Sequence, residues 1–459
     1  MEAQFEARKQ ELLAECEIAP QVFEQVIPRL ERFMKPFVDR LARQEQIDHA
    51  LTMVQGLLSD LDEKNTESIA YRFGQERMPL QWFVGVSDWD DSVLRDELVR
   101  QVGAKLGEPD GVIVFDPSGF PKSGRQSVGV ARQWCGRLGK VDNCQVAVYM
   151  GYASSREQTL VDMRLFLPRE WTKDRARCEK AGIPKEIRYR TRHQLCLEML
   201  QRHGAQLPHN WIAGDDEMGR PYWFRRRLDT LHERYLLSVA CNTLVRDLEV
   251  DPPAYQGRGR KPERPWTRVD KWTSSRPDKD WIQVAVRDGA KGPLLIEMMT
   301  RRVVARTDKG GPGHEEVLVV IRYKDRDDQQ VVKTDYYLSN ASADTKLAEF
   351  GRVAKAEHRI EECIQRAKSE AGLADYQVRN WKGWHHHQTL SLIATWFLVT
   401  EGLRGKKMDT GDHSSPNPRR HFLDPSPGVR MRYTLSGQRG TRAAFKAERT
   451  RTAISLEAI

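Results

Sequence analysis

Three acidic residues lie where their side chains could bind divalent cations. Asp116 follows the apolar run 112–115, Asp215 follows the short run 211–214, and Glu361 lies in a charged stretch with helical spacing. Apolar runs bounded by turn residues are typical of buried strands, so we expect both aspartates at strand ends. Two such ends side by side, with a third carboxylate on a crossing helix, could hold two cations about 4 Å apart for phosphodiester chemistry. The pattern predicts a two-metal nuclease site.

The residues around these acids form three blocks. The first comprises residues 116–124 (DPSGFPKSG), 127–136 (SVGVARQWCG) and 139–146 (GKVDNCQV). The second is 213–219 (AGDDEMG), and the third is 359–368 (RIEECIQRAK), followed by 372–381 (GLADYQVRNW) and 383–387 (GWHHH). In this order, over roughly residues 60–400, the blocks resemble those of DDE-type insertion-sequence transposases.

The resemblance implies a function and a set of partners. It implies that Asp116, Asp215 and Glu361 are catalytic and hold two Mg²⁺ ions, with Mn²⁺ as a substitute. The expected reaction is cleavage of the inverted-repeat ends of an insertion sequence, followed by joining of the 3′-OH ends to target DNA. Because two ends must be cut and joined together, the resemblance also implies a homodimer on double-stranded DNA.

The third carboxylate has competing candidates. Glu361 and Lys368 are seven residues apart and would share one helix face. The family pattern has Tyr and Arg where this chain has Ala354 and Glu357. That departure leaves the register open, with Glu357 and Glu362 as alternatives. The match at Lys368 and the downstream block favour Glu361, with Glu357 one turn earlier as its support.

Two further motifs also have competing interpretations. Asp216 directly follows Asp215, and the spacing to residues 218–219 favours Asp215 as the ligand. The run 385–387 is three histidines. Consecutive helical side chains point about 100° apart and cannot all bind one ion. We therefore expect these histidines to pack against DNA or the catalytic helix.

Basic residues are expected beside the metals, because a phosphate backbone needs positive charge beyond the ions. Lys122, Lys140 and Lys368 are the expected phosphate contacts. Further along the chain, tryptophans and basic residues interleave as a base-stacking platform requires. The members expected to contact DNA are Arg258, Arg260, Lys261, Trp266 and Trp272. Most of the twelve tryptophans are expected in the core.

Changes in pattern divide the chain into five parts and indicate a multidomain α+β protein. We expect a helical DNA-binding domain (1–107), the first part of an RNase H-like catalytic core (108–249), a β-rich insertion (250–345), the C-terminal helices of the core (346–403) and a basic tail (404–459). Residues 401–459 hold twelve Lys and Arg against six acids, most of the net charge of +9. That tail is expected to lie along DNA or a partner subunit.

The expected elements follow from apolar periodicity. Helices are expected over 22–41 (interrupted by Pro28 and Pro36), 51–61, 80–106 and around 195–200. Core strands are expected over 112–115, 145–152, 160–167 and 211–213. In the RNase H-like order the first and fourth strands are parallel neighbours, which would bring Asp116 and Asp215 together. Insertion strands are expected over 281–286, 294–298, 303–305, 317–323 and 331–338.

Composition narrows the protein class. The chain has 459 residues, 39% of them hydrophobic, and a pI near 9.1, which favours a polyanionic partner. Seven scattered cysteines indicate a reducing compartment. The longest apolar run, 390–399, is too short for a membrane span, and the first residues lack the apolar core of a signal peptide. We expect a cytoplasmic, nucleoid-associated bacterial protein. The alternatives are a DNA-binding regulator and a stand-alone nuclease, and the intact acidic triad favours an enzyme.

Overall fold

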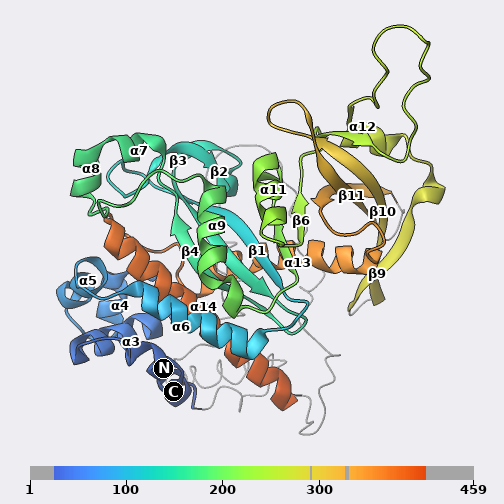
Figure 1. Cartoon of the computed structure of the whole chain (residues 1–459). Coiled ribbons are helices and arrows are strands. Elements are labelled where there is room, and N and C mark those ends of the chain that lie inside the picture. Colours follow the sequence, from blue (N-terminus) through green and yellow to red (C-terminus); the bar gives the residue numbers. More distant parts are fainter. Residues whose placement is uncertain (1–24, 290–291, 326–329, 410–459) are drawn as a thin grey trace, which may run out of the picture. The chain divides into compact units, whose positions relative to one another are not determined.

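A computed structural model describes residues 25–289, 292–325 and 330–409 (Figure 1). Its contacts divide the chain into two compact units. The helical unit consists of the described residues of Met1–Leu98, Lys180–Ile183 and Arg366–Ile459. The sheet unit consists of the described residues of Val99–Glu179 and Pro184–Gln365. The five-part division expected from the sequence remains a prediction.

The helical unit is built around one long helix, α14. Its helices are α2 (Val26–Val38), α3 (Gln44–Leu58), α4 (Thr66–Arg72), α5 (Arg77–Gly85), the first half of α6 (Asp91–Leu106), the last turn of α13 (Leu347–Glu370), and α14 (Trp381–Asp409). Residues 384–397 of α14 are buried on every side, as is typical of a central helix. It packs against α3 and α5.

The N-terminal helices differ from expectation in their boundaries. The stretch expected as one helix over 80–106 is two helices, because Asp90 accepts a hydrogen bond from the backbone N–H of Ser92 and so caps a new helix. Helix α4 was not expected. Asn65 caps it by accepting hydrogen bonds from the backbone N–H groups of Glu67 and Ser68. Pro36 lies inside α2 without ending it.

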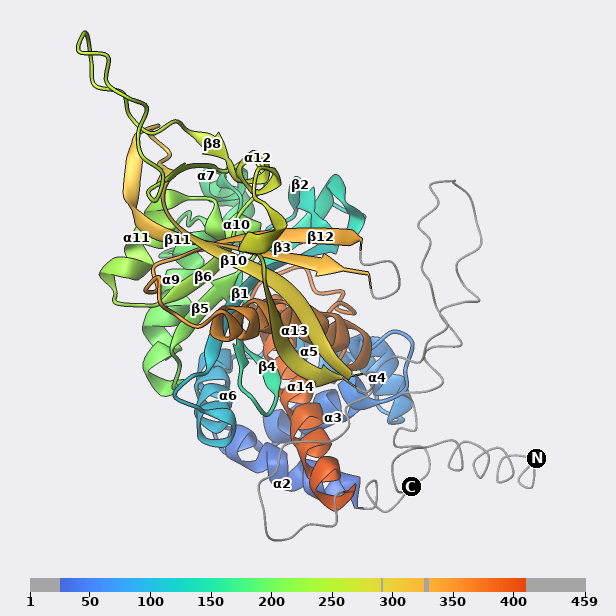
Figure 2. The same ribbon diagram turned by 90° about the vertical axis from the view of Figure 1, so that its right-hand side faces the viewer.

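The sheet unit contains a mixed sheet that has twelve strands within the described residues, in the order β2-β3-β1-β5-β6-β12-β11-β10-β7-β8, with β4 beside β3 and β9 beside β10 (Figures 1 and 2). The strands are β1 (Val112–Pro121), β2 (Ala131–Cys135), β3 (Lys140–Ala153), β4 (Gln158–Leu165), β5 (Trp211–Gly214), β6 (Tyr235–Ser238), β7 (Leu244–Asp247), β8 (Thr267–Arg268), β9 (Ile282–Gly289), β10 (Gly292–Arg306), β11 (Pro312–Lys324) and β12 (Val331–Ser339). The architecture is mixed α+β, as the sequence predicts.

Helices flank the sheet. They are α7 (Arg169–Lys173), α8 (Arg175–Lys180, whose last residue belongs to the helical unit), α9 (Arg192–His203), α10 (Asp216–Gly219), α11 (Tyr222–Thr230), α12 (Val269–Ser274) and most of α13. Helix α9 packs on β3 and β4, and α11 packs on β6. None of the helices in the described residues is long and apolar enough to cross a membrane.

Strand β1 has the neighbours that the sequence predicts. It pairs antiparallel with β3 and parallel with β5. Strand β3 also pairs with β4, which completes the expected meander, and the short strand β2 is an addition at the outer end of β3. The expected parallel pairing of the first strand with the strand after the helix is confirmed. Residues 112–115 of β1 are buried, as is typical of a strand covered on both faces.

The strands of the expected insertion continue the same sheet. Strand β12 pairs antiparallel with β6, so the hydrogen-bonded ladder runs from the first half of the sheet into the second. The two strands expected over 294–298 and 303–305 are one strand, β10. Its polar centre is compatible with a strand because Arg301 forms an ion pair with Asp247 of β7, and Arg302 forms one with Glu315 of β11.

Candidate active site

The register of β1 and β5 places two aspartates next to each other. Phe115 of β1 pairs with Gly214 of β5 in parallel. Asp116 and Asp215 each follow this pair directly, so they are neighbours. Asp215 lies just after the end of β5, as expected, whereas Asp116 does not lie at a strand end, because β1 continues to Pro121 through its pairing with β3. Asp116 also lies opposite Tyr149 of β3.

Asp215 also begins a helix. Its Oδ1 accepts a hydrogen bond of 3.0 Å from the backbone N–H of Met218, which makes it the N-cap of the short helix α10. The turn is tight, because a Cβ on Gly214 would lie 2.9 Å from the side chain of Met218. Glycine at this position therefore allows the chain to turn directly from the strand into α10.

Helix α13 is fixed to the sheet at two points. Near its start, the indole N–H of Trp211 on β5 donates a hydrogen bond of 2.8 Å to Glu349. Further along, Ile360 packs so closely on β3 that a Cβ on Gly151 would lie 2.5 Å from its Cδ1. The neighbouring residue Arg359 donates to the backbone carbonyl of Ser154 at 3.0 Å. These contacts hold the helical turns that carry Glu357 and Glu361 against the sheet.

Electrostatic coupling links the acids of α13 to Asp116 and Asp215. Burial raises the pKa of Asp215 to about 7, although the N–H of Met218 opposes this. The carboxylate of Glu361 is among the nearby charges that add to the increase. Burial, followed by the charges of Asp215, Glu361 and Asp116, holds the pKa of Glu357 well above its ordinary value. The four carboxylates therefore form one interacting group.

The two glutamates differ in exposure. The Glu361 side chain is 57% exposed and lies 3.4 Å from Nδ1 of His358. Glu357 is half-buried, and its buried Oε2 has no hydrogen-bond partner within the described residues. Glu362 is as exposed as Glu361 and contacts the other ring nitrogen of His358. Glu357 is therefore more enclosed than Glu361 or Glu362.

The donor chemistry of this group fits a divalent cation. Across the described parts of the chain, no three His, Cys, Asp or Glu side chains are placed to hold a metal ion as they stand. Carboxylate oxygens are nevertheless the ligands that Mg²⁺ and Mn²⁺ prefer. The raised pKa of Asp215 and the unpaired oxygen of Glu357 show negative charge that lacks compensation. A bound cation would supply that compensation.

The expected phosphate-binding lysines differ in setting. Lys140 is 65% exposed and lies 3.0 Å from Asp142. Lys122 follows β1, where its backbone N–H donates to the carbonyl of Asn143. Lys368 lies on α13 seven residues after Glu361, in the last turn that belongs to the helical unit.

The expected stacking tryptophans are covered. Trp272 is 5% exposed and packs in the core of the second half of the sheet, where its indole N–H donates to Asp247 at 3.0 Å. Its ring is therefore not presented to DNA, which corrects the expectation drawn from sequence. Trp266 is half-buried, with the guanidinium of Arg246 4.3 Å from its ring centre. Arg258, Arg260 and Lys261, by contrast, are exposed.

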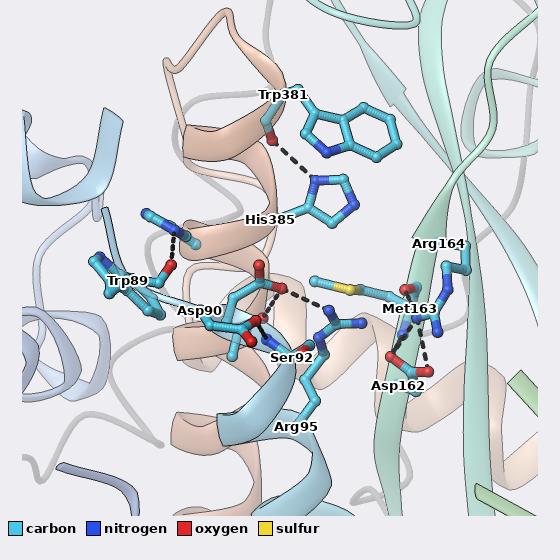
Figure 3. Close-up of polar contacts among 12 residues, drawn as sticks. Trp89, Asp90, Ser92, Arg95, Asp162, Met163, Arg164, Trp381 and His385 are labelled. Carbon is cyan, nitrogen blue, oxygen red and sulfur yellow. Dashed lines mark hydrogen bonds and ion pairs between the residues drawn. The ribbon is translucent and has the colours of Figure 1, made fainter. Parts of the chain in front are cut away.

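The three consecutive histidines pack inside the helical unit. All three are buried, and each ring contacts backbone carbonyl oxygens. The acceptors are the carbonyls of Trp381 for His385, of Val84 and Trp89 for His386, and of Gly372 for His387. The contact between His385 and Trp381 is 2.9 Å long (Figure 3). His386 and His387 therefore link α14 to α5 and to the segments containing Trp89 and Gly372, while His385 bonds within α14.

Residues of β12 that the sequence did not indicate also belong to this site. Asp335 adds to the charges that raise the pKa of Glu357, and Glu357 in turn adds to the effect of burial on the pKa of Tyr337. Both residues reach α13 because β12 joins the sheet beside β6. No local motif marks them, since that pairing joins residues about a hundred positions apart.

Comparison with known proteins identifies the superfamily to which the chain belongs. Residues 36–293, more than half of the chain, match the family described as "DDE superfamily endonuclease". The chain belongs to the DDE superfamily of endonucleases. The family resemblance expected from the three sequence blocks is thereby confirmed.

Similarity to individual known proteins is weaker than the match to the family. The chain is 30% identical over 200 residues to the "Probable transposase for insertion sequence element IS701" of Microchaete diplosiphon, a match that covers 41% of this chain and 48% of that protein. The chain thus spans about half the length of this curated relative. A solved piggyBac transposase synaptic complex with hairpin DNA has a TM-score of 0.38 and 10% identity, covering 84% of this chain and 74% of that one.

Proposed function

We propose that this protein is a DNA transposase. In this proposal it binds the inverted-repeat ends of an insertion sequence, cleaves them by phosphodiester hydrolysis and joins the 3′-OH ends to target DNA. The observation that carries the proposal is the parallel register of β1 and β5, which places Asp116, within β1, beside Asp215, just after β5, and both are electrostatically coupled to Glu357 of α13. Membership of the DDE superfamily supports the same chemistry.

The core that carries these acids is proposed to be RNase H-like. The strand order β4-β3-β1-β5-β6, with β1 and β5 parallel, supports this assignment. The catalytic helix of that core would be α13. The strands from β7 to β12 would then be a β-rich insertion between the second and third carboxylates.

Asp116, Asp215 and Glu361 would hold two Mg²⁺ ions, or Mn²⁺ in their place. When bound, the ions supply activation of the attacking hydroxyl and stabilisation of the charge on the departing oxygen. The protein itself positions its ligands. The N–H of Met218 orients Asp215, and the contact of Ile360 with β3 holds the turn that carries Glu361.

The remaining residues would bind and neutralise DNA. Lys122, Lys140 and Lys368 would contact phosphates, because two metal ions cannot balance a whole backbone segment. Base stacking by Trp272 is not part of the proposal, because the Trp272 side chain is buried. The partner is double-stranded DNA, and the active form is a homodimer that brings two ends together. We place the protein in the bacterial cytoplasm, associated with the nucleoid.

The test is an assay with duplexes that carry the inverted repeats flanking the gene. With Mg²⁺, the wild-type protein should cut at the repeat ends and join the released 3′-OH ends to a plasmid, whereas EDTA should abolish both products. Cutting without joining would identify a stand-alone nuclease. Specific binding with neither product would identify a DNA-binding regulator.

A further inference from the structure

A long segment without helix or strand extends from the second half of the sheet. It runs from residue 248 to residue 266, between β7 and β8, and Figures 1 and 2 show it projecting away from the strands. Loops of more than about 12–15 residues without secondary structure are uncommon and are usually functional or disordered. This loop is ordered at its base, which favours a function.

The tip of the loop carries closely spaced cations. Residues 257–262 read GRGRKP and contain no acid. Arg258, Arg260 and Lys261 are exposed. Neither Arg258 nor Lys261 has an ion pair or hydrogen bond within the described part of the chain, whereas Arg260 forms an exposed ion pair with Glu263. Gly257 and Gly259 have φ values of 77° and 81°, a region that favours glycine, and nothing lies within 4 Å of either missing Cβ.

The base of the loop is held in place. Arg246 of β7 forms an ion pair of 2.6 Å with Glu263, and its guanidinium also covers the ring of Trp266. On the same side, Nε of Arg264 donates a hydrogen bond of 2.7 Å to the carbonyl of Val250. The two sides of the loop are thus tied together below the tip, where Arg258 and Lys261 project into solvent and Arg260 contacts Glu263.

The shape of this tip indicates which surface of duplex DNA it could bind. The minor groove is only about 6 Å wide, too narrow for a helix but open to arginine side chains on an irregular chain. A glycine between two arginines lets the backbone approach the groove closely. The groove is narrowest and most negative in A·T-rich tracts, which attract inserted arginine, and G·C pairs add an amino group there.

We propose that residues 257–262 bind in the minor groove of A·T-rich duplex DNA. This inference rests on the proposed function in that duplex DNA is the substrate. The loop would then set a preference for A·T-rich sequence beside the cleaved end or the target. Arg258 would enter the groove, Arg260 would exchange its exposed ion pair with Glu263 for the groove, and Lys261 would contact a flanking phosphate. This role replaces the base stacking that the interleaved tryptophans indicated.

The test uses the full-length protein and three labelled duplexes of equal length, with A·T, G·C or inosine·cytosine tracts, measured by fluorescence anisotropy. Inosine lacks the minor-groove amino group of guanine but keeps its major-groove pattern. The A·T and inosine·cytosine duplexes should bind about tenfold more tightly than the G·C duplex. Equal binding of all three, or inosine·cytosine behaving like G·C, would overturn the proposal.

Matched variants separate this loop from general charge. Arg258→Ala/Arg260→Ala should remove the preference, and Arg258→Lys/Arg260→Lys should keep much of the affinity but reduce the preference. The control, Arg175→Ala/Arg188→Ala, removes the same charge at exposed sites elsewhere in the sheet unit and should keep the preference. A preference that survives Arg258→Ala/Arg260→Ala would refute the assignment. Duplex binding and cleavage without any preference would refute only this inference, whereas failure of the wild type to bind any duplex would also refute the proposed function.

Discussion

At the scale of single residues, Asp215 has two tasks. It caps α10 through the N–H of Met218, and it lies beside Asp116 at the end of a parallel strand. The cap fixes one carboxylate oxygen in orientation, while burial raises the pKa of the group to about 7. If Asp215 is the proposed metal ligand, one of its oxygens is already oriented for a cation, and the ionised carboxylate is unfavourable until a cation binds.

The acid assignment predicts a clear loss of function. Asp116→Asn, Asp215→Asn and Glu361→Gln should each reduce Mg²⁺-dependent cleavage by at least about a hundredfold, because each change removes charge needed in the transition state. Binding to end DNA should remain, since phosphate contacts are untouched. Nicking and gel-shift assays on the same preparations measure both. Near wild-type cleavage by any one variant would remove that residue from the site.

The raised pKa of Asp215 predicts how stability depends on pH when no metal is bound. A carboxyl whose folded pKa exceeds its ordinary value near 4 stabilises the fold at low pH and loses that contribution as pH rises towards 7. The free energy of unfolding in EDTA should therefore fall by roughly 2–4 kcal/mol between pH 4 and 7 on account of this group. Urea denaturation of wild type and Asp215→Asn should show a flatter profile for the variant. Identical profiles would show that Asp215 does not titrate in this range.

Glu357 and Glu362 should behave differently. Glu357 is half-buried and coupled to the other acids, whereas Glu362 is 57% exposed and contacts His358. Glu357→Gln should lower cleavage roughly tenfold, since residues that support metal ligands have effects of about 10–100-fold. It should also make the stability of the metal-free protein fall less as pH rises, because burial opposes ionisation of the Glu357 carboxyl and glutamine does not ionise. Glu362→Gln is the matched control and should leave both quantities unchanged. A larger cleavage loss in Glu362→Gln would show that the helix register is wrong.

At the scale of elements, the close approach of α13 to β3 sets the position of the third carboxylate. Gly151→Ala should force Ile360 outward, destabilise the protein by about 1–3 kcal/mol and reduce cleavage. Adding Ile360→Ala to Gly151→Ala should relieve the clash, so the double variant should be less destabilised than the two single changes together. Denaturation and cleavage measure both effects. The control Gly136→Ala has open space around its Cβ. Additive changes would show that the two residues do not meet.

At the scale of the whole molecule, expectations for the chain beyond α14 come from its sequence alone. The tail was expected from residue 404, but α14 continues to Asp409, and residues 410–459 lie outside the described part. Ion pairs of Arg29 and Arg404 with Glu401 hold this end of α14, so a truncation should begin after Asp409.

Truncation after Asp409 should weaken DNA binding and reduce its salt dependence. The removed segment is rich in arginine, and each cation that neutralises a phosphate contributes about 0.9 to the slope of log K against log salt. Binding titrations between low and moderate salt measure the slope for both proteins. A matched chain with these arginines replaced by glutamine controls for length. An unchanged slope would show that the tail does not contact DNA.

Local sequence patterns predicted a large part of the architecture. The apolar run before Asp116, the helical stretch around Glu361 and the alternating segments of the second half each predicted an element that the structure contains. Boundaries were less accurate where side-chain pairing decides them. Strand β10 continues through Arg301 and Arg302 because acids on neighbouring strands compensate their charge, and sequence periodicity does not report such partners.

Sequence alone indicated which residues could do chemistry, namely two aspartates after apolar runs and a glutamate on a helix. It also supplied the blocks that resemble the superfamily. These signals are local, because they depend on a residue and its near neighbours along the chain. Three features could be seen only in the fold: Phe115 pairs with Gly214, Glu357 is half-buried and electrostatically coupled to the other acids, and Trp272 is buried. Strand register and burial arise from contacts between segments far apart in sequence, so no local pattern could determine them.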